Sequence, residues 1–396
     1  MVQNLNDFLT VKGGCPVITN PLLQLQSFGQ SIWLDLLRRS LITSGELQRY
    51  VDEDGLRGIT SNPKIFHDAI DGSADYDDDI QLLAPMSSDM RGLYESLAVS
   101  DIQAASDVFR PVYERLDGRD GFVSLEVNPH LAHDTAGTVA EARRLWKWVD
   151  RPNVFIKIPA TREGLPAIQR CLCEGININI TLLFGLQRYR DVAHAFISAM
   201  EERAADGKPL ARVESVASFF LSRIDVLLDP MLEKVALDGG ERAATASELK
   251  GKVAIGSAKL AYQIYKEVFD TEQFRRLAEK GARTQRVLWA STSTKNPDYE
   301  DLMYVEPLIG PNTVNTVPLE TLNAYRDHGH PEPRLEQGVQ EAQQTLQSLK
   351  GLGIEIDAVT QQLEDEGVTK FIEPFDKLLA SLENKQRSIS VAVTGA

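Results

Sequence analysis

The sequence has few cysteines and no long apolar run. Its 396 residues include only Cys15, Cys171 and Cys173, too few for a disulfide framework at this length, which indicates a reducing compartment. No run of about 18 apolar residues occurs, so no membrane-spanning segment is expected. The first ten residues lack the charged and then apolar pattern of a signal peptide. We therefore expect a cytoplasmic protein.

Positive charge is also in the minority. The chain has 42 Lys and Arg against 57 Asp and Glu, a formal net charge of −15. Proteins that bind nucleic acids or membrane surfaces need a basic face to meet phosphate groups, so we expect neither partner. The hydrophobic content of 43% is ordinary for a globular chain and can supply a large core. Assembly into a homo-oligomer is left open.

Several cofactor motifs are missing. The sequence contains no GxGxxG and no GxxxxGK[ST], which weakens a dinucleotide or nucleoside-triphosphate function. It has no HExxH spacing, and His130 and His133 lie in no metal-ligand pattern with cysteine or carboxylate. The GxSxG elbow of serine hydrolases is absent too.

Short apolar runs rich in β-branched residues alternate with stretches of helical period. This alternation predicts parallel strands joined by helices, an α/β fold. Eight strands suggest one closed (β/α)8 TIM barrel over residues 1–396, and a doubly wound open sheet is the alternative. The eight predicted strands are 31–36, 58–62, 122–127, 154–159, 178–184, 214–221, 286–292 and 304–309.

Two long connections, near 64–121 and 223–285, are predicted to be helical insertions because each has room for more than one helix. The acidic stretch 71–79 is expected to be a solvated loop, since it lacks the glycine and closing glutamate of an EF-hand. Thr138 and Glu141 have the spacing of a capping box at a helix start.

Lys157 stands inside the apolar run Val-Phe-Ile-Lys-Ile-Pro. Burying an ammonium group is costly, and burial lowers the pKa of a lysine amine. Such an amine is a nucleophile suited to Schiff-base chemistry. A lysine paired for structural reasons near a barrel end is an equally good interpretation of this residue alone.

Two carboxylates also lie late in predicted strands. Asp35 ends Ile-Trp-Leu-Asp, and Glu126 ends Val-Ser-Leu-Glu. The ends of barrel strands converge on one mouth, where active sites lie. Together with Lys157 they would give a nucleophile and acid/base partners. A structural ion-pair network is the alternative.

Polar residues mark strands two and five. Period two places Asn177, Asn179 and Thr181 on one face, which should point into the lumen because helices cover the outside. They could orient a polyol substrate or a water, or form a polar layer that satisfies itself. Thr60 and Asn62 end strand two in the same way, or simply open a loop.

Candidate anion-binding residues occur late in the chain. Arg223 follows strand six, and Ser291 and Lys295 follow strand seven. Barrels commonly hold phosphate near this position, although each side chain alone could simply be solvated. The predicted mouth is therefore locally positive, with Lys157, Arg223 and Lys295 near one another.

Seven segments resemble transaldolases in sequence, order and spacing, over roughly residues 30 to 383. The resemblance implies a dihydroxyacetone transfer in the pentose phosphate pathway, without metal or organic cofactor. The donor would be sedoheptulose 7-phosphate or fructose 6-phosphate, and the acceptor glyceraldehyde 3-phosphate or erythrose 4-phosphate. The segments are IWLDLLRRSLITSGEL, GITSNPKIF, VSLEVNP, FIKIPAT, GININITLLF, SVASFFLSRID and VLWASTSTKNPDY.

The same resemblance implies roles for individual residues. Lys157 would form the Schiff base at C2 of the ketose, and Asp35 would take the proton of the C4 hydroxyl. Glu126 and Thr181 would relay protons through a water. The implied substrate-binding residues are Thr60, Asn62, Asn179, Ser218, Phe220, Arg223, Ser291 and Lys295.

Two positions bear on the reaction type and the phosphate site. Phe220 resembles the transferases, whereas relatives that release free dihydroxyacetone have tyrosine there. Some transaldolases have Ser-x-Arg after strand seven, where this chain has Ser291-Thr-Ser-Thr-Lys295. The alternatives are an aldolase of the same fold that releases free dihydroxyacetone, and a barrel that serves as a non-catalytic scaffold.

Overall fold

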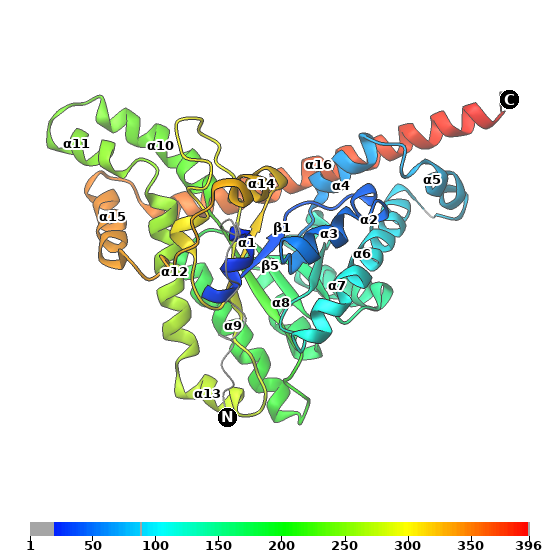
Figure 1. Cartoon of the computed structure of the whole chain (residues 1–396), viewed down its shortest axis with the longest axis horizontal. Helices are drawn as coiled ribbons and strands as arrows, with labels where there is room; N and C mark the ends of the chain where they lie inside the picture. Colours follow the sequence, from blue (N-terminus) through cyan, green and yellow to red (C-terminus); the bar gives the residue numbers. More distant parts are fainter. Residues whose placement is uncertain (1–19, 88, 395–396) are drawn as a thin grey trace, which may run out of the picture.

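Eight parallel strands close into a barrel. The computed structural model describes residues 20–87 and 89–394. Each strand pairs with the next in sequence and β8 returns to β1, so the predicted (β/α)8 barrel is confirmed and the open sheet is wrong (Figure 1). The strands are β1 (Gln30–Leu34), β2 (Gly58–Ile59), β3 (Phe122–Glu126), β4 (Val154–Pro159), β5 (Ile178–Leu183), β6 (Ser215–Phe220), β7 (Arg286–Ala290) and β8 (Thr313–Val317).

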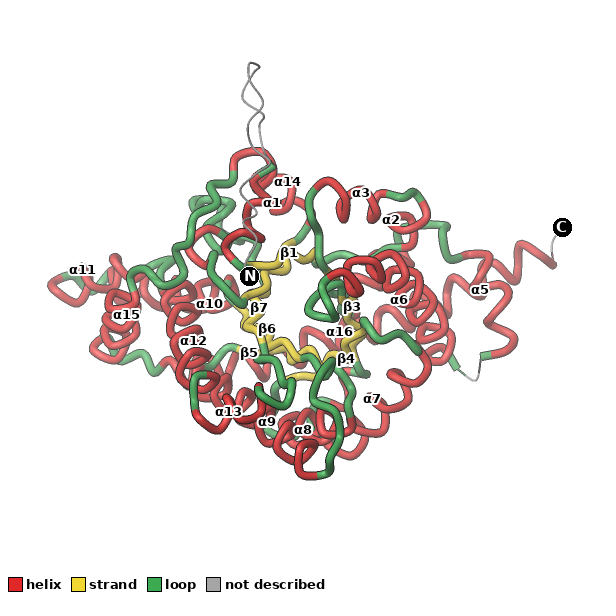
Figure 2. Tube along the Cα trace, turned by 60° about the horizontal axis from the view of Figure 1, so that its bottom comes forward, coloured by secondary structure: helices red, strands yellow, loops and turns green. Residues whose placement is uncertain are grey.

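Helices surround the ring of strands (Figure 2). They cover its outer face, so the strands are buried on both sides. This burial explains why most of the strand sequences are apolar runs. None of the helices in the described parts of the chain has the length and apolar character needed to cross a membrane. The α-helices are α1 (Pro21–Leu25), α2 (Arg39–Thr43), α3 (Glu46–Glu53), α4 (Pro63–Asp71), α5 (Asp77–Leu83), α6 (Met90–Arg115), α7 (Thr135–Val149), α8 (Gly164–Glu174), α9 (Leu186–Ala205), α10 (Ser222–Ala236), α11 (Gly240–Leu249), α12 (Val253–Phe269), α13 (Glu272–Ala278), α14 (Leu319–His328), α15 (Val339–Gly351) and α16 (Ile356–Thr394).

Aromatic side chains fill the lower part of the barrel lumen. Trp33, Phe122 and Phe155 lie on the same strand faces as Asp35, Glu126 and Lys157 respectively, nearer the amino ends of their strands. The rings of Phe122 and Phe155 stack with centroids 4.2 Å apart, and Trp33 lies 6.0 Å from Phe155. This layer forms an apolar floor beneath the charged residues at the carboxyl ends.

The predicted eighth strand at 304–309 is wrong. Glu306–Leu308 is a 3-10 helix, and the barrel closes instead through Thr313–Val317. Pro307 has no backbone N–H and cannot join a central ladder, so the proline argued against a strand there. Three of the five residues in the true strand, TVNTV, are polar, so it contains no apolar run.

The predicted capping box at the start of α7 is also wrong. The N-cap lies four residues earlier, at Asp134, whose side chain accepts from the backbone N–H of Gly137 at 2.9 Å. Thr138 donates its hydroxyl to the Leu131 carbonyl at 2.9 Å, and Glu141 accepts from the Asn128 backbone N–H at 3.0 Å. Both side chains thus fix the loop after β3 rather than the helix end.

The two long connections are helical. The first contains α4, α5 and α6, and the second contains α10, α11, α12 and α13. The acidic stretch 71–79 is only partly a loop, because Asp77 begins α5 and Tyr76 before it is fully buried. Aspartates in the first turn of α5 interact favourably with the helix dipole, which explains a helix in so acidic a segment.

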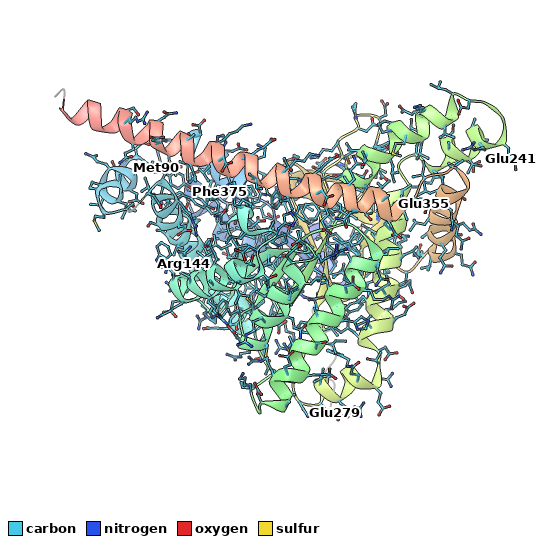
Figure 3. The ribbon with its side chains drawn as sticks, turned by 180° about the vertical axis from the view of Figure 1, so that it is seen from behind. Met90, Arg144, Glu241, Glu279, Glu355 and Phe375 are labelled. Atoms are coloured by element: carbon cyan, nitrogen blue, oxygen red, sulfur yellow. The ribbon has the colours of Figure 1, made fainter. Side chains whose placement is uncertain are left out.

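Helix α16 runs across the carboxyl-terminal mouth of the barrel (Figures 2 and 3). It is tied to α9 by the ion pair between Arg188 and Glu364, with Nε and Oε2 3.1 Å apart. Further along, Lys385 pairs with Asp77 of α5 at 2.9 Å and donates to the Ile70 carbonyl at 2.7 Å. The helix continues to Thr394.

Candidate active site

One cavity of about 420 Å³ opens at the mouth of the barrel. Strand ends converge there, and α16 contributes Phe371 to its wall. The three cations predicted to gather at the mouth all line this cavity. Nine of the twelve predicted site residues line it: Asp35, Thr60, Asn62, Lys157, Ser218, Phe220, Arg223, Ser291 and Lys295. The other three, Glu126, Asn179 and Thr181, are buried beside them.

Lys157 and Glu126 form a buried pair on adjacent strands. Their Cα atoms are register partners, and Lys157 Nζ lies 3.6 Å from Glu126 Oε2. The amine also donates to the Ser61 carbonyl at 3.1 Å. Lys157 is 5% exposed and Glu126 is 9% exposed, so water screens their interaction little. An amine held this way faces the cavity without a strong hydrogen bond to the carboxylate.

Burial shifts the titration of Glu126. Loss of solvation raises the pKa of Glu126 to about 7, although the nearby ammonium of Lys157 acts in the opposite direction; the charge of Asp35 raises the pKa further. A carboxyl group that titrates near neutrality can both accept and donate a proton at working pH. This is the property that a proton relay needs.

Two buried oxygens of the site lack hydrogen-bond partners. Glu126 Oε2 and Thr181 Oγ1 have no hydrogen bond from any described residue. Thr181 ends the regular part of β5, where the register with β6 shifts and Leu182 adopts φ 56°. Left-handed backbone at a leucine is strained, by about 1 kcal/mol. Unpaired polar atoms and local strain are both typical of functional sites.

Asp35 is held in place by a chain of hydroxyl groups. Thr60 Oγ1 donates to Asp35 Oδ1 at 2.6 Å. Since that hydroxyl has only one proton, Thr316 must donate to Thr60 in their contact of 2.7 Å. This series of hydrogen bonds leaves the second carboxylate oxygen of Asp35 free to accept a proton in the cavity.

The predicted amides have different surroundings. Asn179 is fully buried below the cavity, where it accepts from the Ser218 hydroxyl at 2.6 Å and donates to the Ser124 hydroxyl at 3.0 Å. Asn62 caps α4, and its Oδ1 accepts from the Ile65 backbone N–H at 3.0 Å. Its Nδ2 group remains to donate to a ligand, whereas Asn179 mainly fixes Ser218.

Arg223 is a half-buried cation with unused donors. Its guanidinium carbon lies 5.3 Å from the centre of the Phe220 ring, and Nη1 has no hydrogen-bond partner among the described residues. Burial lowers the pKa of Arg223, and the negative charges of Asp35 and Glu366 oppose that effect. A desolvated guanidinium facing a cavity is suited to bind an oxyanion.

Ser291 and Lys295 line the same cavity as Arg223. The hydroxyls of Ser291 and Ser222 are 2.9 Å apart, and Ser291 has φ 55°, a left-handed conformation. Lys295 is exposed and donates to the Ser293 hydroxyl. Arg223 is therefore the more buried of the two cations and Lys295 the more exposed.

Comparison with known proteins agrees with this geometry. The family model described as transaldolase/fructose-6-phosphate aldolase matches residues 32–382. The chain belongs to the transaldolase/fructose-6-phosphate aldolase family. It is 48% identical to "Transaldolase 2" of a Nostoc species over 94% of this chain and 99% of that one. It is also 48% identical to the transaldolases of Trichodesmium erythraeum, over 94% and 100% of the two chains, and Thiobacillus denitrificans, over 89% and 97%.

Membership in the transaldolase/fructose-6-phosphate aldolase family makes the chain an enzyme, a transferase of the transaldolase type. The non-catalytic scaffold is therefore wrong. Among residues 20–87 and 89–394, no group of three or more His, Cys, Asp or Glu side chains is arranged to hold a metal ion.

The transaldolase-type cavity also contains residues that the sequence did not indicate. The Phe371 ring of α16 lies 5.7 Å from Lys157 Nζ, a contact between residues more than 200 positions apart. Thr316 was missed because strand eight was placed at 304–309. Lys64, in the first turn of α4, also lines the cavity and pairs with Asp68 at 2.5 Å. The only feature of the sequence that pointed to Lys64 was its position two residues after Asn62.

Proposed function

We propose that the chain transfers a dihydroxyacetone unit from a ketose phosphate to an aldose phosphate through a Schiff base on Lys157. The observation that carries the proposal is the buried Lys157 amine 3.6 Å from the Glu126 carboxylate, at the floor of a cavity lined by Arg223. Sedoheptulose 7-phosphate and fructose 6-phosphate would be the donors. Glyceraldehyde 3-phosphate and erythrose 4-phosphate would be the acceptors. The reaction would belong to the cytoplasmic pentose phosphate pathway.

The first step is formation of the imine. The neutral amine of Lys157 attacks C2 of the ketose, and the carbonyl oxygen leaves as water after it has been protonated. Glu126 supplies and accepts these protons, because its pKa of about 7 allows both at neutral pH. A water between Glu126 Oε2 and Thr181 Oγ1 would satisfy both unpaired oxygens and carry the protons.

The second step is cleavage of the C3–C4 bond. Asp35 accepts the proton of the C4 hydroxyl through the oxygen that Thr60 does not occupy. The C4–O bond becomes a carbonyl, and the electron pair of the C3–C4 bond moves into the iminium group. The aldose phosphate leaves, and an enamine of dihydroxyacetone remains on Lys157. The second aldose then adds to C3 by the reverse of this step.

Binding of the phosphate is assigned to Arg223, with Ser291 and Lys295 in support. These residues are on one wall of the cavity, away from Lys157 in sequence but within the same 420 Å³ space. Asn62, Asn179 and Ser218 would position the hydroxyl groups of the sugar, Asn179 through its bond to Ser218.

Trapping the imine tests the proposal directly. The full chain is treated with borohydride in the presence of fructose 6-phosphate, and the modified residue is identified by mass spectrometry. Reduction should give a stable adduct on Lys157, and omission of the sugar should give none. An unmodified Lys157, or an adduct on another lysine, would contradict the mechanism.

The type of acceptor distinguishes the transferase from an aldolase. Phe220 has no hydroxyl to position a water or protonate the enamine. The enamine should therefore persist until an aldose phosphate binds. Two-substrate kinetics should be ping-pong, with little free dihydroxyacetone. In Phe220→Tyr we expect the release of free dihydroxyacetone to rise severalfold. Release at the full rate by the wild-type enzyme would favour the aldolase alternative.

A further inference from the structure

A second cavity, of about 390 Å³, lies at the opposite end of the barrel, where the strands begin. It is formed by the residues before β1, β2, β3, β6, β7 and β8, so it shares no residue with the cavity at the mouth. Four arginines and two carboxylates line it: Arg57, Arg119, Arg283, Arg286, Asp120 and Glu214. In a chain with a net charge of −15, this excess of cations calls for an explanation.

Two of the four arginines are neutralised by the carboxylates. Arg283 Nη1 pairs with Glu214 Oε1 at 2.9 Å, and Arg286 Nη1 pairs with Asp120 Oδ2 at 3.2 Å. Asp120 also accepts from the Trp33 indole N–H at 2.8 Å. These contacts account for both carboxylates of the cavity.

The other two arginines form no ion pair with a described residue. Arg57 is half-buried and donates to the neutral amide oxygen of Gln26 at 2.5 Å, but it forms no ion pair with a described residue. Burial lowers the pKa of Arg57, and the nearby cations Arg286 and Arg115 lower it further, whereas Asp120 raises it. Arg119 likewise forms no ion pair with any residue in the described ranges. The cavity thus contains two unmatched positive charges.

We infer that this cavity binds a phosphate dianion, either inorganic phosphate or the phosphate group of a small metabolite. Two guanidinium groups match the charge of the dianion and offer paired N–H donors to its oxygens. The volume exceeds that of phosphate alone and falls in the range of small-molecule sites. Leu116, Phe274 and Ala282 form an apolar wall that could contact the remainder of a phosphorylated metabolite.

The site is separate from the proposed catalytic chemistry. The aromatic layer of Trp33, Phe122 and Phe155 lies between the amino end of the barrel and Lys157. A ligand here would therefore act as an effector or stabiliser rather than as a substrate.

Titration calorimetry of the full chain with inorganic phosphate, at constant ionic strength, tests the inference. The wild-type protein should bind two phosphates, one at each end of the barrel. Arg223→Gln should lose the site at the mouth and keep the other. The double variant Arg57→Gln/Arg119→Gln should keep the site at the mouth and bind at the amino end at least about tenfold more weakly.

Matched controls make the result decisive. Arg212→Gln removes a neighbouring exposed arginine that pairs with Asp117 at 3.6 Å and does not line the cavity, so both sites should remain. Turnover by the double variant reports that it is folded, and the single variant Arg119→Gln removes an exposed side chain without disturbing the core. Two phosphates bound normally by the double variant would overturn the inference. So would a wild-type protein whose only site disappears in Arg223→Gln, or one that binds succinate as tightly as phosphate at the amino end.

Discussion

The two ends of the barrel hold their buried carboxylates in different ways. At the mouth, Glu126 Oε2, Thr181 Oγ1 and Arg223 Nη1 are buried without hydrogen-bond partners among the described residues. At the amino end, the buried carboxylates Asp120 and Glu214 are each paired with an arginine. Unpaired polar groups cost stability, whereas satisfied networks fix the structure. The carboxylates at the mouth are therefore arranged for chemistry, and those at the amino end for stability.

The largest effect should come from removing Lys157, the proposed nucleophile. In Lys157→Met we expect turnover to fall by about 10⁴-fold or more, since the covalent step is lost. The melting temperature should change little, because Glu126 can become neutral by binding a proton and methionine fits the apolar surroundings. Enzyme assays and thermal unfolding measure the two quantities. Residual turnover near the wild-type level would show that Lys157 is not the nucleophile.

The opposite pattern is expected at the amino end. Asp120→Ala leaves Arg286 and the Trp33 indole N–H without their partner, which should reduce the free energy of unfolding by about 3–5 kcal/mol. The kcat/KM of the folded enzyme should remain within about twofold of the wild type. Denaturant unfolding and steady-state kinetics test this. If activity fell while stability did not, the division between the two ends would be incorrect.

Thr181→Val should separate stability from activity on a smaller scale. The hydroxyl has no partner, so its replacement by a methyl group should leave stability unchanged or raise it by about 1 kcal/mol. Turnover should nevertheless fall by about 10- to 100-fold, because the proposed relay water would lose a hydrogen-bond partner. Thr181→Ser is the matched control and should retain most of the activity. A loss of stability in the valine variant would mean that the hydroxyl is bonded within the fold.

The smallest effects concern pH. Burial raises the pKa of both Glu126 and Glu214 to about 7, so the folded chain binds more protons than the unfolded chain between about pH 4.5 and 7. The free energy of unfolding should therefore fall as the pH rises through this interval, and less steeply in either glutamine variant.

The pH dependence of the rate should distinguish the two glutamates. If Glu126 acts as the base, kcat/KM should rise with pH to an inflection near 7 that Glu126→Gln removes. Glu214→Gln should keep that inflection, because Glu214 lies at the amino end. If Glu214→Gln lost the inflection instead, the group that titrates in the rate profile would lie at the amino end of the barrel and not at the mouth.

The sequence predicted much of the fold because each strand except the eighth is an apolar run bounded by polar residues. It failed at β8, where TVNTV has no such run and the apolar 304–309 contains Pro307. The positions of Asp35, Glu126 and Lys157 could be predicted because strand ends converge in a barrel. Their roles came from the resemblance to transaldolases and not from spacing.

Contacts over long sequence distances could not be predicted. Phe371 reaches Lys157 only because α16 crosses the mouth, and no periodicity in α16 indicates that path. Arg57 and Arg119 come together with Arg283 and Arg286 because loops at the amino ends of different strands meet there. Such groupings depend on strand order, register and loop direction together.

The path of α16 has a consequence for how the enzyme is made. All eight strands precede α16 in the chain, so during synthesis Lys157, the two carboxylates of the mouth and Arg223 emerge before Phe371. The anchor of Lys385 on the Ile70 carbonyl joins residues 315 positions apart and can form only at the end of that process. A nascent chain can therefore close its barrel while the Lys157 amine still lacks its aromatic cover, and the site becomes complete only when the last helix docks.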